Sequence, residues 1–217
     1  MKKIGLLLSG CGVYDGSEIH ETVLTMLAID RAGAQYVCFA PNEEQHHVIN
    51  HVKGEPAEEK RNMMVEAARI ARGEITALAD ADLSTLDALI LPGGFGAAKN
   101  LCDYAFKGTD CSVREDVKAA ITKVHEAGKP VGALCIAPAI IAKIFGDKGV
   151  EVTIGSDEKT AGDLQKMGAK HVNCSAEVCH VDDKLKIVTA PAYMCAGSIK
   201  EAAAGIEKLV DKVIEMA

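Results

Sequence analysis

The 217-residue chain contains no tryptophan, and aromatic residues make up only 4% of it. It also lacks any run of about 18 apolar residues, so we expect no membrane-spanning segment and no membrane partner. Its 24 basic residues are outnumbered by 31 acidic ones, which gives a net charge of −7. Because binding to a phosphate backbone requires clustered lysine and arginine, this balance argues against nucleic acid as a partner.

The eight cysteines are spread along a chain that is long enough to form a core without disulfides. Several lie within apolar runs, so we expect a cytoplasmic protein in which most cysteines are small buried hydrophobic residues. The apolar N-terminus faintly resembles a signal peptide, but it is short and has no cleavage-type site, which favours a buried strand. The spacing of His171, Cys174, Cys179 and His180 does not match a standard zinc pattern, so we expect no metal.

Apolar runs and helical spacing alternate along the chain. The runs predict strands at 3–8, 35–40, 86–91, 130–134, 150–155 and 185–190. Helices are predicted after Ser17, with Ile19, Val23, Met26 and Leu27 on one face, and near 60–71, 116–127, from 135 and from 198. A polar, histidine-rich excursion is expected at 41–60. This alternation predicts a single α/β domain of residues 1–217 with a mostly parallel sheet between helices.

Cys135 is the first candidate reactive residue, because ligands of such sheets bind at the carboxyl ends of the strands. It directly follows an apolar strand, with Gly132 before it and Ala137 after it, in the pattern of a strained nucleophile elbow. We expect a helix to begin there and to lower the pKa of the thiol. The alternative is a buried cysteine that only packs against the sheet.

Two further features fall at strand ends. The Gly93-Gly94 pair follows a strand and, with the N–H of Ile136, could bind a developing oxyanion. Glu18 and Glu21 lie in the first turns of the first helix, after a strand that we expect to neighbour the Cys135 strand, and either could exchange protons with the thiol. The alternatives are a plain turn for the glycines and helix-dipole compensation for one of the acids.

Four segments give the chain a resemblance to a known family. They are Ile4 to Asp30, Leu91 to Leu101 (LPGGFGAAKNL), Gly132 to Pro138 (GALCIAP) and Thr189 to Met194 (TAPAYM). The chain resembles the PfpI-type superfamily, which shares the class I glutamine amidotransferase fold and includes the Parkinsonism-associated deglycase. Within it, the chain is most similar to the glyoxalase ElbB group, which is also described as amidotransferase-like and linked to isoprenoid biosynthesis.

The resemblance implies a flavodoxin-like three-layer sandwich with Cys135 as the nucleophile. It places the acidic partner at Glu21 rather than Glu18 and the oxyanion donors at Gly94 and Ile136, and it implies a homodimer. Two departures matter. Protease-like relatives have histidine where this chain has Ile136, and the His-x-Glu pair of true glutamine amidotransferases is missing from residues 190–194. We therefore expect neither a competent glutaminase nor a peptidase.

The expected activity is that of a cofactor-free glyoxalase, which converts glyoxal or a similar small 2-oxoaldehyde to glycolate through a Cys135 hemithioacetal. The same thiol addition would serve a deglycase. A different class of function is also open: a redox-sensing or partner-binding protein in which Cys135 is an oxidation sensor.

Overall fold

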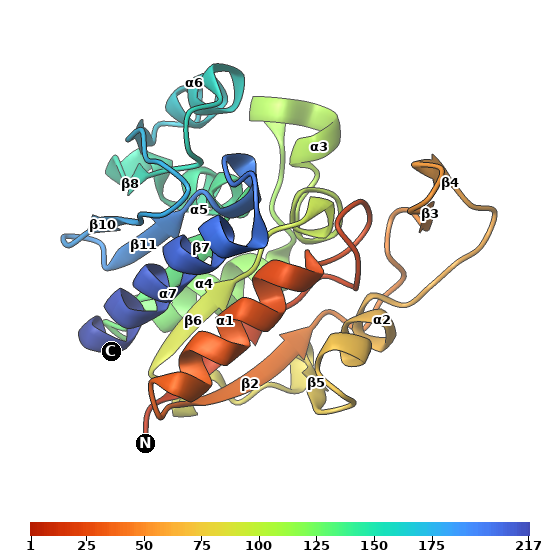
Figure 1. The fold of residues 1–217 in the computed structure, drawn as a ribbon, viewed down its shortest axis with the longest axis horizontal. Helices are drawn as coiled ribbons and strands as arrows, with labels where there is room; N and C mark the ends of the chain where they lie inside the picture. The colour runs from red at the N-terminus through yellow and green to blue at the C-terminus, as the bar shows by residue number, and fades with distance from the viewer.

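The computed structural model describes all residues, 1–217, around one seven-stranded sheet (Figure 1). The strand order is β10-β11-β7-β6-β1-β2-β5, and every pairing is parallel except that of β10 with β11. The bounds of the strands are β1 Lys3–Leu7, β2 Gln35–Ala40, β5 Ile75–Ala77, β6 Ala88–Leu91, β7 Val131–Leu134, β10 His180–Asp182 and β11 Ile187–Ala190. Five of the six predicted strands are confirmed in this sheet, and the one predicted at 185–190 is β11.

Helices cover both faces of the sheet. On one face, α1 (Ile19–Arg31) and α7 (Ile199–Met216) lie side by side, next to α2 (Met63–Ile70), as Figure 1 shows. On the other face lie α4 (Glu115–Glu126) and α5 (Pro138–Phe145). Each face buries its own apolar cluster, so the strands read as continuous hydrophobic runs rather than as alternating ones. The α/β class and the flavodoxin-like sandwich are confirmed.

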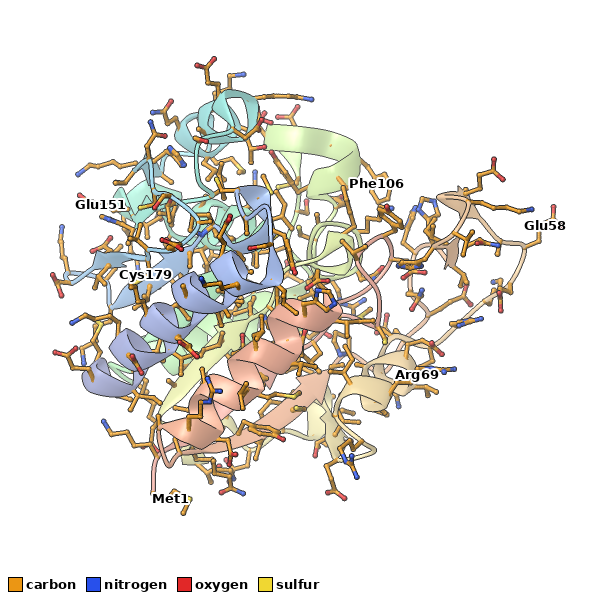
Figure 2. All side chains as sticks on the ribbon, in the orientation of Figure 1. Met1, Glu58, Arg69, Phe106, Glu151 and Cys179 are labelled. Carbon is orange, nitrogen blue, oxygen red and sulfur yellow. The ribbon has the colours of Figure 1, made fainter.

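Shorter elements lie outside the sheet. The hairpin of β3 (Ile49–Asn50) and β4 (Glu55–Pro56) projects from the body in Figure 1, and Figure 2 places Glu58 at the far end of this projection. The remaining elements are α3 (Tyr104–Lys107), α6 (Glu158–Lys166), β8 (Glu151–Val152) and β9 (Lys170–His171). The strand predicted at 150–155 forms only as the shorter β8, which pairs with β9 outside the main sheet. No helix has the length and apolar character needed to cross a membrane.

Of the apolar face predicted for the first helix, only Met26 is buried. Ile19, Val23 and Leu27 are 39–47% exposed, whereas Glu21 and Thr25 are fully buried. The threonine hydroxyl donates to the Glu21 carbonyl oxygen, 2.7 Å away, so this polar residue is satisfied within the helix. Apolar periodicity found the helix but not its orientation, because the buried face carries a carboxylate toward the sheet edge.

Two expectations about the neighbourhood of Cys135 are also corrected. The helix that follows it begins at Pro138, so residues 135–137 form a turn and Cys135 is not a helical residue. The strand that precedes the glutamates does not neighbour the cysteine strand, because β6 lies between β1 and β7. Since all three strands are parallel, their carboxyl ends still meet at one edge of the sheet.

Candidate active site

Cys135 lies on a strained turn at the carboxyl end of β7. Its φ is +58°, a left-handed conformation that side chains other than glycine adopt at a cost of about 1–3 kcal/mol. Its N–H donates to the carbonyl oxygen of Ala190 at 3.0 Å, which continues the ladder with β11 up to this residue. The chain then turns sharply into α5, and the largely buried thiol lines a pocket at the sheet edge. The structure thus shows the elbow geometry that the sequence predicted.

The loop after β6 passes so close to Cys135 that only glycine fits there. A Cβ on Gly93 would lie 2.3 Å from the Cβ of Cys135 and 2.6 Å from Oε2 of Glu21. Gly94 has a φ of +92°, and a Cβ there would lie 2.4 Å from the carbonyl oxygen of Gly16. The Gly93-Gly94 pair is therefore more than a plain turn: its two residues bring backbone N–H groups against the thiol and the carboxylate.

Glu21 is fully buried and extends from the first turn of α1 toward the thiol. Its Oε2 accepts a hydrogen bond from the N–H of Gly93 at 2.9 Å, and its Oε1 accepts one from the N–H of Tyr193 at 3.2 Å. The carboxyl group also hydrogen bonds with the thiol of Cys135. Burial, reinforced by the nearby charge of Glu18, raises the pKa of Glu21 to about 7.

Glu18 has a different task, although it lies three residues before Glu21. It is the N-cap of α1, and its Oε2 accepts from the backbone N–H of Glu21 at 2.6 Å. Ser17 accepts from the N–H of Ser9 at 2.8 Å. Of the two candidate acids, the structure brings Glu21 to the thiol, while Glu18 caps the helix and lines the pocket.

The thiol of Cys135 is not activated in the way that the sequence suggested. Burial and then the charge of Glu21 raise its pKa well above the ordinary value, although N–H groups of Gly94 and Ile136 that hydrogen bond with the sulfur lower it. The expected net lowering of the pKa is wrong, because burial and the charge of Glu21 outweigh these two N–H groups, and α5 itself begins three residues later. A neutral thiol beside a carboxyl group that titrates near pH 7 requires general-base assistance, and Glu21 is placed to supply it.

The pocket that Cys135 lines has a volume of about 550 Å³. Its walls are mainly apolar, and the aromatic rings of Phe95 and Phe106 form part of them. Polar groups enter from α6, which contributes Lys159 and Asp163. Such a volume with few polar groups is typical of a small-molecule site.

Residues that the sequence analysis did not single out hold these loops together. Asn100 donates from Nδ2 to the carbonyl oxygens of Ser9 and Asp15, both at 2.9 Å, and accepts the N–H of His46 at 2.9 Å. It lies in a π-helical turn, residues 97–101, and such turns often occur beside functional sites. The position of Asn100 shortly after the glycine loop was the feature of the sequence that could have indicated its role.

Tyr193 was also missed as a contributor to the site. It follows β11, its N–H donates to Glu21, and Ala192 before it has a φ of +44°. The position of this segment at the carboxyl end of a strand could have indicated a site residue. No group of three or more histidine, cysteine, aspartate or glutamate side chains is arranged to hold a metal ion.

Comparison with known proteins shows similarity along the whole chain. It is 47% identical to the glutamine amidotransferase-like class 1 domain-containing protein 3, mitochondrial, of Homo sapiens, covering 99% of this chain and 83% of that protein. It is 46% identical to the ES1 protein homolog, mitochondrial, of Rattus norvegicus, with 99% and 84% covered. The expected cytoplasmic location is wrong by this finding, since these curated relatives are named as mitochondrial proteins.

Two solved structures share the fold of this chain. The isoprenoid biosynthesis protein with amidotransferase-like domain from Ehrlichia chaffeensis is 36% identical, with a TM-score of 0.92 over 99% of this chain and 100% of that one. Glyoxalase III from Candida albicans shares the fold at 16% identity, with a TM-score of 0.63 over 99% and 97% of the two chains. A family model described as DJ-1/PfpI family matches residues 11–196. The chain therefore belongs to the DJ-1/PfpI family.

Proposed function

We propose that this protein is a cofactor-independent glyoxalase of the ElbB group, which converts glyoxal or a similar small 2-oxoaldehyde to the 2-hydroxy acid. One observation carries the proposal: the strained, buried thiol of Cys135 hydrogen bonds with a buried carboxyl group whose pKa is about 7. N–H groups of Gly94 and Ile136 converge on the same sulfur. The proposed nucleophile and oxyanion donors line one pocket, and the proposed base, buried beside it, hydrogen bonds with the thiol.

In the first step, the sulfur of Cys135 bonds to an aldehyde carbon while Glu21 takes the thiol proton. The electron pair of the carbonyl bond moves to the oxygen, where the N–H groups of Gly94 and Ile136 stabilise the negative charge. Protonated Glu21 then returns the proton to this oxygen, which gives a neutral hemithioacetal and restores the carboxylate. A carboxyl group with a pKa near 7 can perform both transfers at neutral pH.

In the second step, Glu21 removes the hydrogen of the sulfur-bearing carbon and delivers it to the neighbouring carbon. The intermediate between these transfers is an enediolate, and the product is a 2-hydroxyacyl thioester on Cys135. Water then cleaves the thioester, which releases glycolate when the substrate is glyoxal and restores the thiol. Every proton that Glu21 takes is returned, so no cofactor, oxidant or glutathione enters the balance.

The size of the pocket favours a related, second activity. A two-carbon dialdehyde fills only a small part of about 550 Å³, and the apolar walls could contact a larger group attached to the reacting carbons. Aldehyde-modified amino or thiol groups of small molecules or peptides have this form. A deglycase would use the same addition to Cys135, and a rate that rises with the size of the attached group would identify it.

The burial of Cys135 speaks against the alternative of an oxidation sensor. Sensor cysteines are accessible and have a low pKa, because the thiolate is the species that peroxide attacks. Here the side chain is largely buried and the pKa is raised. Selective sulfinate formation at Cys135 under mild peroxide, without turnover of aldehydes, would nevertheless establish the sensor in place of the enzyme.

The direct test is glycolate formation from glyoxal by the purified protein without glutathione, with Cys135→Ser beside the wild type. We expect turnover by the wild type and a loss of about 1,000-fold or more in the serine variant, which keeps the size of the side chain but is a far weaker nucleophile. Equal rates of glycolate formation in the two proteins would contradict the proposal.

A further inference from the structure

Tyr193 and His20 form a hydrogen-bonded pair beside the proposed reaction centre, and no step above uses their side chains. Nδ1 of His20 lies 2.8 Å from the hydroxyl oxygen of Tyr193. Tyr193 lines the same pocket as Cys135, and its backbone N–H holds Oε1 of Glu21. His20 directly precedes Glu21 in the chain. The pair therefore adjoins the carboxylate that would move the protons.

The reaction needs donors for two oxygens, one on each carbon of the 2-oxoaldehyde. The addition of sulfur places negative charge on the first oxygen, which faces the N–H groups of Gly94 and Ile136. After that oxygen has been protonated, removal of the carbon-bound hydrogen by Glu21 places new negative charge on the second oxygen. Two N–H groups that converge on the sulfur serve the first oxygen, so the second requires a donor elsewhere in the pocket.

Tyr193 adjoins Glu21 through its backbone N–H, whereas Lys159 of α6, another donor that lines the pocket, has an exposed side chain. The hydroxyl of Tyr104 already donates to Asp163 at 3.0 Å, and the carboxylate of Glu18 is an acceptor. Ile136 offers an alkyl side chain. Burial and the charges of Glu18 and Glu21 raise the pKa of Tyr193, so its hydroxyl stays protonated and remains a donor.

Resting on the proposed glyoxalase activity, we propose that Tyr193 is a further catalytic residue whose hydroxyl donates a hydrogen bond to the second oxygen of the substrate as the enediolate forms. His20 is its positioning residue: it carries hydrogen on Nδ1 and donates it to the Tyr193 oxygen, which leaves the phenolic hydrogen for the substrate. As the thioester forms, the first oxygen loses its proton to water and the second gains one from water. Tyr193 and His20 end the cycle unchanged.

The test is a double-mutant cycle in the glyoxal assay. Tyr193→Phe should lower kcat about 10- to 100-fold with KM nearly unchanged, because the hydroxyl acts on charge that develops during the reaction. His20→Ala should lower kcat about 3- to 10-fold alone and have no further effect in the Tyr193→Phe background. Tyr36→Phe, an exposed tyrosine on β2, is the matched control and should keep the full rate.

Alkylation of Cys135 by iodoacetamide serves as the check on the site, and its rate should be the same in Tyr193→Phe as in the wild type. A kcat of Tyr193→Phe within about twofold of the wild type overturns the inference and leaves the proposed function standing. So does a full, independent effect of His20→Ala in the double variant, since a merely structural histidine would behave in that way. Absence of turnover by the wild type itself defeats the proposed function and this inference with it.

Discussion

Cys135 and Cys38 are both buried thiols of the central sheet, and burial raises the pKa of both, that of Cys38 to about 12. They differ in what surrounds the sulfur. Cys38 lies in the middle of β2, and burial alone accounts for its raised pKa. Cys135 lies past the end of β7 in a left-handed conformation, with Glu21 and two backbone N–H groups against its sulfur.

The comparison shows that burial does not separate a structural cysteine from a reactive one. What separates them is a partner that can remove the proton and donors that can hold the charge that follows. The base comes from the first turn of α1 and one of the donors from the loop after β6, so the difference arises from the topology of the sheet. Substitutions at these residues should remove this difference, and alkylation should measure it.

After loss of the nucleophile itself, removal of the base should have the largest effect. Glu21→Gln should lower kcat/KM for glyoxal about 100- to 1,000-fold, because the amide cannot take the thiol proton. The wild-type kcat/KM should rise as the pH passes through about 7, where Glu21 ionises, and the variant should lose this rise. Glu18→Gln is the matched control, with a loss of at most about threefold, since its amide oxygen can still accept the N–H that it caps. Equal losses in both variants would contradict the roles assigned to the two acids.

The pH dependence of the free energy of unfolding should also reveal the ionisation of Glu21. Its pKa is raised from an ordinary 4.5 to about 7 in the folded state, so the folded protein binds the proton more tightly than the unfolded chain. The stability from this group is therefore fully present below pH 4.5 and is lost as the pH rises through about 7. Chemical denaturation of the wild type against Glu21→Gln should show a relative loss of about 3 kcal/mol between pH 4.5 and 7.5. A difference that does not change with pH would show that Glu21 titrates normally.

Alkylation rates compare the reactivity of the Cys135 and Cys38 thiols directly. At pH 8, iodoacetamide should modify Cys135 at least about tenfold faster than Cys38, because only Cys135 has a base beside its sulfur. The rate at Cys135 should increase as Glu21 ionises, and Glu21→Gln should remove this increase. Peptide mass spectrometry over a time course separates the two cysteines. Equal rates of modification at both cysteines would mean that Glu21 does not speed the alkylation of Cys135.

Much of the fold and part of the site follow from local sequence. Short apolar runs found the strands, and a cysteine directly after one of them, followed by small residues, predicted the elbow at Cys135. The Gly93-Gly94 pair was equally readable, because its lack of side chains has one local consequence, close approach of the backbone. Features of this kind depend on a few consecutive residues and so are visible without a structure.

The rest depends on contacts between distant segments. The raised pKa of Cys135 comes from burial and from Glu21, which lies 114 positions earlier in the chain, and a local rule about helix ends predicted the opposite direction. The orientation of α1 was missed because apolar periodicity pointed Ile19 and Val23 inward, whereas the site requires Glu21 there. Tyr193 was missed because its contribution is a backbone N–H, which every residue other than proline possesses.

The smallest effect is expected at the thiol that serves as the reference. Cys38→Ala removes a buried sulfur from β2 and should lower the free energy of unfolding by about 1 kcal/mol, the scale of a small core truncation. Turnover of glyoxal should stay within about twofold of the wild type, because the groups that act on the Cys135 thiol do not contribute to the raised pKa of Cys38. Thermal unfolding checks the expected loss of stability, and the glycolate assay on the same sample checks the expected rate of turnover. A large loss of turnover with little loss of stability would place Cys38 in the chemistry and remove the distinction between the two cysteines.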